Sequence, residues 1–185
     1  TVHGMLDDWC MAQKSFKKRI YLAIGARRML ERASAVHCTA QAELEQAQRW
    51  FPRGRGVVIP LVFDLEPFRN LPGAAPARNA IAAAKTDEPI ILFLSRLHEK
   101  KRVDIVIDLA KQLRDDGLRA QIIIAGTGEP AYESALRAQV ERADAGDYVH
   151  LVGLVTGEAK VSLFEQASVF VLPTISDGFA ITQLE

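Results

Sequence analysis

The sequence predicts an α/β protein built on a Rossmann-like, doubly wound parallel sheet. Two observations support this fold class. In the C-terminal half, short apolar runs that suit buried strands alternate with amphipathic segments that suit helices. Each interval between apolar runs is also long enough for a crossover helix, which parallel strands need. Sheets of this kind bind ligands beyond the carboxyl ends of their strands.

Four strands and three helices are expected in this half. The strands are expected at Ile90–Leu94, Gln121–Ala125, Val149–Val152 and Val169–Leu172. The helices between them are expected at Val103–Arg114, Tyr132–Ala143 and Glu158–Gln166. The candidate ligand loops are therefore those that follow Leu94, Ala125, Val152 and Leu172.

The N-terminal half is less regular. Residues 13–33 predict a helix with a basic bias, since seven cations there accompany one acid, Glu31. This bias suits either an ordinary solvated face or attraction to anionic lipid headgroups. Strands are expected at 35–39 and 57–60, with a helix between them that Thr39 caps. Residues 66–87 are rich in Ala and Pro and predict a linker followed by a weak helix.

Composition bounds the class of protein. A chain of 185 residues can hold one full domain and part of another, and its apolar content of 49% is typical of a globular protein. The 23 basic and 23 acidic residues balance, which argues against general nucleic-acid binding. Cys10 and Cys38 are too few for a disulfide framework and suit reduced thiols in a cytoplasmic protein. No apolar run spans a bilayer, and residues 1–12 lack a signal-peptide pattern. The start at Thr1 hints at a truncated N-terminus.

The loop after the first strand is cationic. It places Arg96, Lys100, Lys101 and Arg102 within seven residues. Arginine offers a planar fork to phosphate oxygens and lysine a mobile point charge, so the loop could form an anion site. The alternative is a solvated basic turn before a helix.

The loop after the second strand carries two glycines. Gly126 and Gly128 could let a ligand approach the backbone closely. The run also fits a weak G-x-G-x-x-A dinucleotide pattern. That pattern requires an acid at the end of the following strand, whereas Asp144 and Asp147 precede a strand. The spacing therefore argues against a nicotinamide cofactor.

The last two loops offer a tight turn and a phosphate-type site. Gly153 follows the third strand, before a helix that Thr156 is expected to cap. After the fourth strand, Asp177 and Glu185 stand eight positions apart around the start of a predicted helix at Gly178. The free N–H groups of a helix N-terminus suit a phosphate, and two acids at this spacing could reach one elongated ligand. Asp177 could equally be only a cap.

These motifs occur in a characteristic order along the chain. They are Ser95-Arg96-Leu97 with Lys101-Arg102, then Ala125-Gly126-Thr127-Gly128, Leu151-Val152-Gly153, and Asp177-Gly178-Phe179-Ala180 with Leu184-Glu185. Upstream stand His3-Gly4-Met5-Leu6, the segment around Ala35, and Ile59-Pro60 with Asp64. Together they resemble the nucleotide-sugar-dependent glycosyltransferases of the GT-B architecture, retaining family 4 (group 1).

The resemblance implies a role for each site residue. Arg96 and Lys101 would hold the donor diphosphate, Asp177 the transferred sugar and Glu185 the ribose, with His3 across the cleft. The backbone near Gly178, Phe179 and Ala180 would bind phosphate or sugar hydroxyls, and Gly126, Gly128 and Gly153 would line the donor pocket. The family more often has Glu where this chain has Asp177. No Asp-x-Asp motif occurs, so the donor is expected to be bound without a metal or other cofactor.

The resemblance also implies a division of the chain. Residues 1–62 would be the tail of an N-terminal acceptor-side domain, 63–88 an interdomain linker, and 89–185 an incomplete donor-binding domain. The sheet edge after Val169–Leu172 would be exposed, which predicts marginal stability or self-association.

The expected function is sugar transfer by the parent protein. It would move a sugar from a nucleotide-diphosphate donor to a saccharide or lipid-linked acceptor, with retention, in bacterial cell-surface polysaccharide synthesis. The enzyme would be cytoplasmic, and its basic helix could face the inner membrane. Two alternatives stay open: an inactive fragment that only binds nucleotide diphosphate, and a sugar-nucleotide epimerase or glycogen-synthase-like enzyme of the same architecture.

Overall fold

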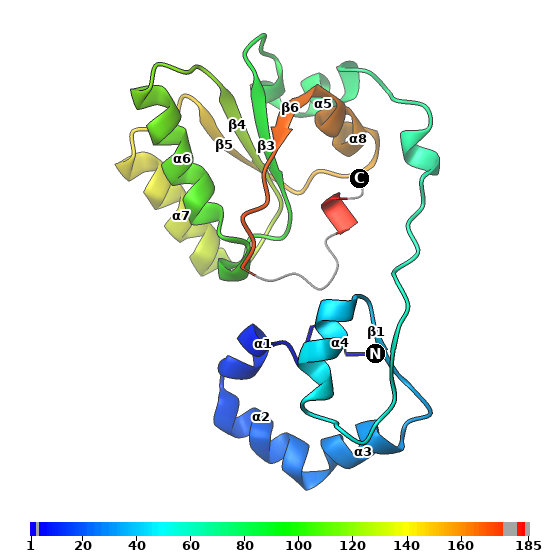
Figure 1. Ribbon diagram of the computed structural model, residues 1–185. Coiled ribbons are helices and arrows are strands. Elements are labelled where there is room, and N and C mark those ends of the chain that lie inside the picture. Colours follow the sequence, from blue (N-terminus) through cyan, green and yellow to red (C-terminus); the bar gives the residue numbers. More distant parts are fainter. Residues whose placement is uncertain (3, 176–180, 184–185) are drawn as a thin grey trace. The chain divides into compact units, whose positions relative to one another are not determined.

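The computed structural model describes residues 1–2, 4–175 and 181–183 (Figure 1). The chain divides into two compact units, of which the first includes Thr1–Phe63 and the second Asp64–Ile175. Each unit has its own buried apolar cluster or clusters. The expected helix start at Gly178 and the acids Asp177 and Glu185 lie outside the described residues.

Unit 2 contains the predicted parallel sheet. Its described strands are β3 (Ile90–Leu94), β4 (Gln121–Ala125), β5 (Val149–Gly153) and β6 (Ala167–Phe170), in the order β5-β4-β3-β6. All neighbouring strands are parallel. The connecting helices are α6 (Val103–Asp115), α7 (Pro130–Arg142) and α8 (Gly157–Gln166). The predicted fold class is confirmed, and β6 begins two residues earlier than the sequence predicts.

The helices cover both faces of this sheet. Figure 1 shows α6 and α7 on one face, and α8 with α5 (Ala75–Ala80) on the other. Successive strand residues point to opposite faces, so Phe93 joins the cluster beneath α6 and α7 while Leu92 joins the cluster beneath α8. Burial on both faces explains why these strands are continuous apolar runs rather than alternating ones.

The segment expected to be a linker packs partly into unit 2. Residues 63–88 include the 3₁₀ turns η2 (Glu66–Phe68) and η3 (Ala82–Ala84) as well as α5. Ala77, Ile81 and Ala84 are buried against the α8 face of the sheet. The Ser162 hydroxyl of α8 donates to the Gly73 carbonyl at 2.5 Å and accepts from the Ala77 N–H at 3.1 Å. Small alanine side chains let this segment lie close to the sheet.

Unit 1 contains short helices around a two-stranded parallel sheet. The strands are β1 (Val36–Cys38) and β2 (Gly56–Val58). The helices are α1 (Asp8–Ala12), α2 (Ser15–Tyr21), the π-helical η1 (Leu22–Ala26), α3 (Arg27–Arg32) and α4 (Gln41–Gln48). The prediction of one continuous helix at 13–33 is therefore wrong. Lys14 is left-handed at φ 50°, and Gly25 leaves helical angles at φ 175° and ψ −21°.

Two predicted helix caps also differ from the structure. Ala40, not Thr39, occupies the N-cap position of α4, and the Thr39 hydroxyl donates to the buried Glu43 carboxylate at 2.8 Å. Glu43 also accepts the backbone N–H groups of Thr39 at 2.6 Å and Gly4 at 2.5 Å, so its charge is satisfied by nearby donors. Thr156 does stand at the N-cap of α8, but its side chain makes no capping hydrogen bond.

Candidate functional site

The topology of unit 2 places a switch point between β3 and β6. Chain connections run from β3 through α6 to β4 on one face, and from β5 through α8 to β6 on the other. Strand order therefore reverses at β3, with β4 on one side and β6 on the other. Open α/β sheets bind ligands at the carboxyl ends of the strands next to such a switch point. The loops at 95–102 and 171–175 lie there.

Among the described residues, Arg96 is a cation that is available to a ligand at this switch point. Its side chain is exposed, and it makes no hydrogen bond or ion pair within the described part of the chain. Its backbone is held by neighbours in the chain: Ser95 donates to the Ala125 carbonyl at 3.1 Å and Leu97 to the Thr127 carbonyl at 2.9 Å. A fixed backbone with an unengaged guanidinium is suited to binding an anion.

Arg102 is already used by the protein. Its guanidinium forms a forked pair with Asp104, with Nε–Oδ1 at 3.0 Å and Nη2–Oδ2 at 2.8 Å. The hydrogen bond from Arg102 lowers the pKa of Asp104. Arg102 is also left-handed at φ 52°, where the turn η4 (Glu99–Lys101) meets α6. In the cationic loop predicted from the sequence, Arg102 therefore serves the start of α6, whereas Arg96 is exposed at the switch point.

Gly126 and Gly128 contact chain rather than open space. A Cβ on Gly126 would lie 1.9 Å from the Ser95 carbonyl oxygen, and one on Gly128 would lie 2.0 Å from that of Leu97. Gly126 also has φ +141°, which L side chains rarely adopt. The sequence suggested that these glycines admit a ligand to the backbone. In the structure the neighbouring loop occupies that space, so the glycines bring Arg96 close to the end of β4.

Gly153 joins the same group of loops. Its carbonyl accepts the Gly126 N–H at 2.7 Å, and its own φ is +75°. Apart from its two neighbours in the chain, no described residue has a heavy atom within 4 Å of the position that a Cβ on Gly153 would occupy. Backbone hydrogen bonds thus link the loop after β3 to the loop after β4, and the loop after β4 to Gly153 at the end of β5. Gly153 has space beside its Cα.

These backbone contacts bring some of the predicted site residues onto neighbouring loops. Arg96, Gly126, Gly128 and Gly153 lie on loops that hydrogen-bond to their neighbours, and half-buried Lys101 ends the η4 turn. The other predicted site residues lie outside the described residues: His3, Asp177, Gly178, Phe179, Ala180 and Glu185. Their roles stay predictions.

Thr174 is a site residue that the sequence did not indicate. Its hydroxyl donates to the Lys100 carbonyl at 3.2 Å, and the Ile175 N–H donates to the same oxygen at 2.9 Å. These bonds join the loop after β6 to the loop after β3 across the switch point. A threonine after a strand carries no signal for such a partner 74 positions away.

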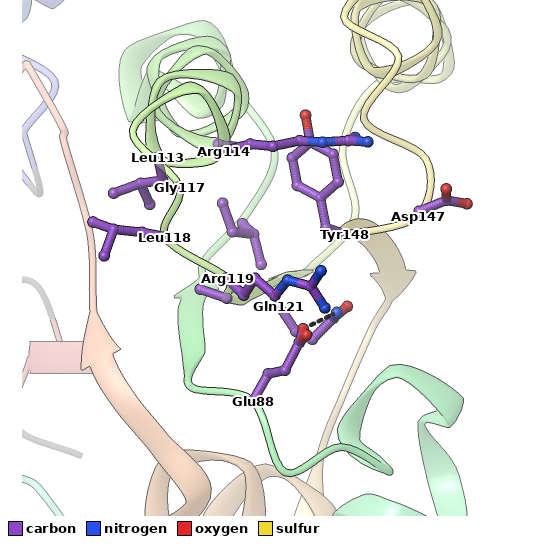
Figure 2. A pocket seen from close by; sticks show the side chains of 12 residues that line it. Glu88, Leu113, Arg114, Gly117, Leu118, Arg119, Gln121, Asp147 and Tyr148 are labelled. Carbon is purple, nitrogen blue, oxygen red and sulfur yellow. Dashed lines mark hydrogen bonds between the residues drawn. The ribbon is translucent and has the colours of Figure 1, made fainter.

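A cavity lies at the opposite edge of the sheet (Figure 2). It has a volume of about 560 Å³ and is lined by residues that precede β4 and β5 and end α6. Gln121 donates to Glu88 at 2.6 Å on its floor, and Arg114 lies 4.8 Å from the centre of the Tyr148 ring. These groups engage one another, and the amino ends of the strands are not where such sheets bind ligands. We therefore place the candidate site at the carboxyl ends.

The described residues show neither a metal-binding cluster nor a membrane-spanning helix. Residues 1–2, 4–175 and 181–183 contain no group of three or more His, Cys, Asp or Glu side chains that could hold a metal ion. None of the helices in this part of the chain is long and apolar enough to cross a membrane.

Comparison with protein families and curated proteins identifies relatives. Residues 77–185, more than half of the chain, match the family described as "Glycosyl transferases group 1". EpsF of Bacillus subtilis, assigned as a glycosyltransferase, is 27% identical over 174 residues, which is 92% of this chain and 44% of EpsF. WcaL of Escherichia coli K12, assigned as a glycosyltransferase of colanic acid biosynthesis, is 28% identical over 126 residues, which is 68% of this chain and 28% of WcaL. The chain thus spans less than half the length of these relatives.

Solved structures share the fold. Sucrose-phosphate synthase from Thermosynechococcus elongatus superposes with a TM-score of 0.71 at 24% identity, over 89% of this chain and 40% of that protein. HepE from Anabaena, solved with UDP and glucose, superposes with a TM-score of 0.70 at 21% identity, over 89% of this chain and 44% of HepE. These glycosyltransferases have the GT-B fold, of which this chain covers a part.

Proposed function

Because the chain belongs to the group 1 glycosyl transferases, we propose that its parent protein transfers a sugar from a nucleotide-diphosphate donor to a saccharide or lipid-linked acceptor, with retention. One observation supports this most directly. At the switch point of a doubly wound sheet, Arg96 presents a guanidinium that no described residue engages, beside the η4 turn that carries Lys101.

Sugar transfer requires positive charge beside the diphosphate of the donor. Cleavage of the bond between sugar and diphosphate leaves growing negative charge on the leaving nucleotide. Cations placed beforehand stabilise that charge in the transition state without reorganising. Arg96 would bind diphosphate oxygens through its fork, and Lys101 would supply a second charge. We propose that these two replace a metal ion, so that the donor is bound without one.

The remaining roles follow the family resemblance. We propose that Asp177 contacts the transferred sugar, that Glu185 binds the ribose, and that His3 lies across the cleft. The backbone near Gly178, Phe179 and Ala180 would bind phosphate or sugar hydroxyls. Gly153, with open space beside its Cα, would line the base pocket.

A second candidate concerns the chain by itself. It spans 44% of EpsF and 28% of WcaL, so it matches less than half the length of either relative. We propose that the isolated chain binds nucleotide diphosphate without turnover. A sugar-nucleotide epimerase of the same architecture is the alternative, and assaying epimer formation beside sugar transfer separates the two reactions.

Calorimetric titration with UDP, GDP and ADP tests donor binding. We expect Arg96→Ala to weaken binding by about 10- to 100-fold, since a hydrogen bond to a charged group contributes about 1.5–3 kcal/mol. Arg119→Ala is the matched control. Arg119 is also exposed and free of described partners, but it borders the cavity at the other edge of the sheet. Equal affinities for wild type and Arg96→Ala would remove the phosphate role, and detectable sugar transfer by the chain alone would refute the binding-only view.

The cellular role is proposed from the relatives. EpsF and WcaL are glycosyltransferases by assignment, and WcaL is assigned to colanic acid biosynthesis. We propose that the parent protein acts in bacterial cell-surface polysaccharide synthesis and is located in the cytoplasm, where nucleotide sugars are available.

We also propose that the basic segment of unit 1 contacts anionic membranes from the cytoplasmic side. Residues 14–32 carry seven cations and one acid, and Arg27 pairs with that acid, Glu31, at 3.2 Å. Large apolar side chains on the same segment are exposed, including Phe16 at 75% and Ile24 at 81%. Exposed apolar groups beside cations are typical of helices that bind lipid surfaces.

Vesicle co-sedimentation tests this contact. We expect binding to vesicles with anionic lipid and weaker binding to neutral vesicles. Ile24→Ser should weaken it, whereas Leu154→Ser, which changes a side chain of unit 2 that is 72% exposed, should not. Equal sedimentation with anionic and neutral vesicles would eliminate the proposal.

A further inference from the structure

We propose that Thr174 is a positioning residue that holds the cationic loop of the donor site in its binding conformation. This proposal rests on the proposed binding of nucleotide diphosphate. Thr174 follows β6, and its bond to Lys100 links the two loops that border the switch point.

Both backbone polar groups of Lys100 are hydrogen-bonded. Its N–H donates to His98 Nδ1 at 3.1 Å, from the residue that caps η4. Its carbonyl accepts the Thr174 hydroxyl at 3.2 Å and the Ile175 N–H at 2.9 Å. A carbonyl oxygen has two lone pairs, so these two donors satisfy it fully. The loop after β6 therefore supplies the outer support of the η4 turn.

This support matters because Lys101 comes next in the chain. The ammonium of a lysine sits on a flexible stem, so its average position depends on where the backbone starts that stem. The η4 turn spans only Glu99–Lys101 and ends at left-handed Arg102. A short turn of this kind has few bonds of its own. Holding it before the ligand arrives reduces the ordering cost of binding.

The test compares UDP with uridine, because only UDP carries the diphosphate. Thr174→Val keeps the shape of the side chain and removes the hydroxyl. We expect it to weaken UDP binding by roughly fivefold, the loss of about one hydrogen bond, and to leave uridine binding unchanged. Thr174→Ser keeps the hydroxyl and should bind UDP within about twofold of wild type.

Thr86→Val is the matched control. The Thr86 hydroxyl also bonds to backbone, accepting the Glu88 N–H at 3.0 Å, but it lies before β3 at the opposite edge of the sheet. This variant loses the same kind of contact and should bind UDP like wild type. Thermal unfolding of all variants verifies that they are folded at the temperature of the titrations, and Thr174→Ala provides a second variant if the valine protein is not.

The outcomes separate the inference from the proposed function. If wild type binds UDP, Arg96→Ala binds it more weakly, and Thr174→Val binds like wild type, the positioning role is refuted and donor binding stands. Equal losses for UDP and uridine, or equal losses for Thr174→Val and Thr86→Val, would also refute it, because the hydroxyl would then act through general stability. No binding of UDP, GDP or ADP by wild type would overturn both.

Discussion

Replacing Gly126 with Ala should break the contact between the loops after β3 and β4. The new Cβ would lie 1.9 Å from the Ser95 carbonyl oxygen and 2.9 Å from its carbon, whereas ordinary contact begins at 3.4 Å. One loop must therefore move by about 1.5 Å, and both neighbours are backbone, which cannot rotate away as a side chain can. The Ser95 N–H bond to the Ala125 carbonyl lies directly beside the clash.

Two costs add up in this variant. Forcing extra volume into a packed site costs about 1–3 kcal/mol, and a non-glycine residue at φ +141° costs about 1–3 kcal/mol more. A loss of about 2–6 kcal/mol is a large fraction of the 5–15 kcal/mol that stabilises a typical domain. Unit 2 should therefore unfold at a much lower urea concentration, or at a temperature lower by about 10 °C or more.

Urea unfolding with two probes measures this loss. The chain's two tryptophans, Trp9 and Trp50, both lie in unit 1, so their fluorescence reports unit 1 while far-ultraviolet circular dichroism also reports unit 2. We expect the dichroism transition to shift and the fluorescence transition to stay. Gly146→Ala is the control: its Cβ would meet nothing within 4 Å, so it should be neutral or slightly stabilising. Equal midpoints for Gly126→Ala and Gly146→Ala would refute the steric reasoning.

Three further predictions concern stability. Leu163→Ala, at a fully buried position between α8 and the sheet, should lower the free energy of unfolding by about 2–5 kcal/mol, and a loss below 1 kcal/mol in urea unfolding would contradict the core assignment. Burial lowers the pKa of His150, so the unfolded chain binds a proton at this imidazole more readily than the folded chain does. The free energy of unfolding should therefore fall as the pH drops below about 6.5. In His150→Gln, the midpoint of urea unfolding should depend less on pH between about 7.5 and 5.5. Parallel pH profiles would refute this. Within the described residues β6 pairs only with β3, and Val169 of β6 is 51% exposed. Sedimentation velocity should therefore show concentration-dependent self-association, which Val169→Lys should reduce. A monomer with a sharp, high thermal transition would contradict this prediction.

The parallel sheet could be predicted because its signal is local. The run Ile122-Ile123-Ile124 is apolar without alternation, and the structure buries Ile122 and Ile124 on one face and Ile123 on the other. Side-chain period and run length are properties of a few adjacent residues, and so are the glycines and prolines that separate them. The break at Gly25 was missed because a helical pattern tolerates an isolated glycine, and whether it bends depends on what the helix packs against.

The sequence predicted which loops carry the candidate site, but not which of their side chains the protein itself already engages. The sequence placed cations after β3, and the strand order of the structure puts that loop at the switch point. The charge pattern alone could not distinguish Arg96, whose side chain has no partner among the described residues, from Arg102, which is held by Asp104. The family resemblance pointed to Arg96, but only the positions of neighbouring side chains show which of the two arginines the protein already uses.

The amino-acid sequence by itself determined the alternation of strands and helices, the parallel sheet and the edge where a ligand should bind. Only the tertiary structure decided that Gly126 and Gly128 make room for a neighbouring loop, that α5 packs into unit 2, and that Thr174 holds the Lys100 carbonyl. The physical reason is how far apart along the chain the interacting residues lie. Periodicity and charge are properties of neighbours in the chain, whereas a carbonyl 1.9 Å from a missing Cβ and a hydroxyl 74 positions from its partner exist only once the chain has folded.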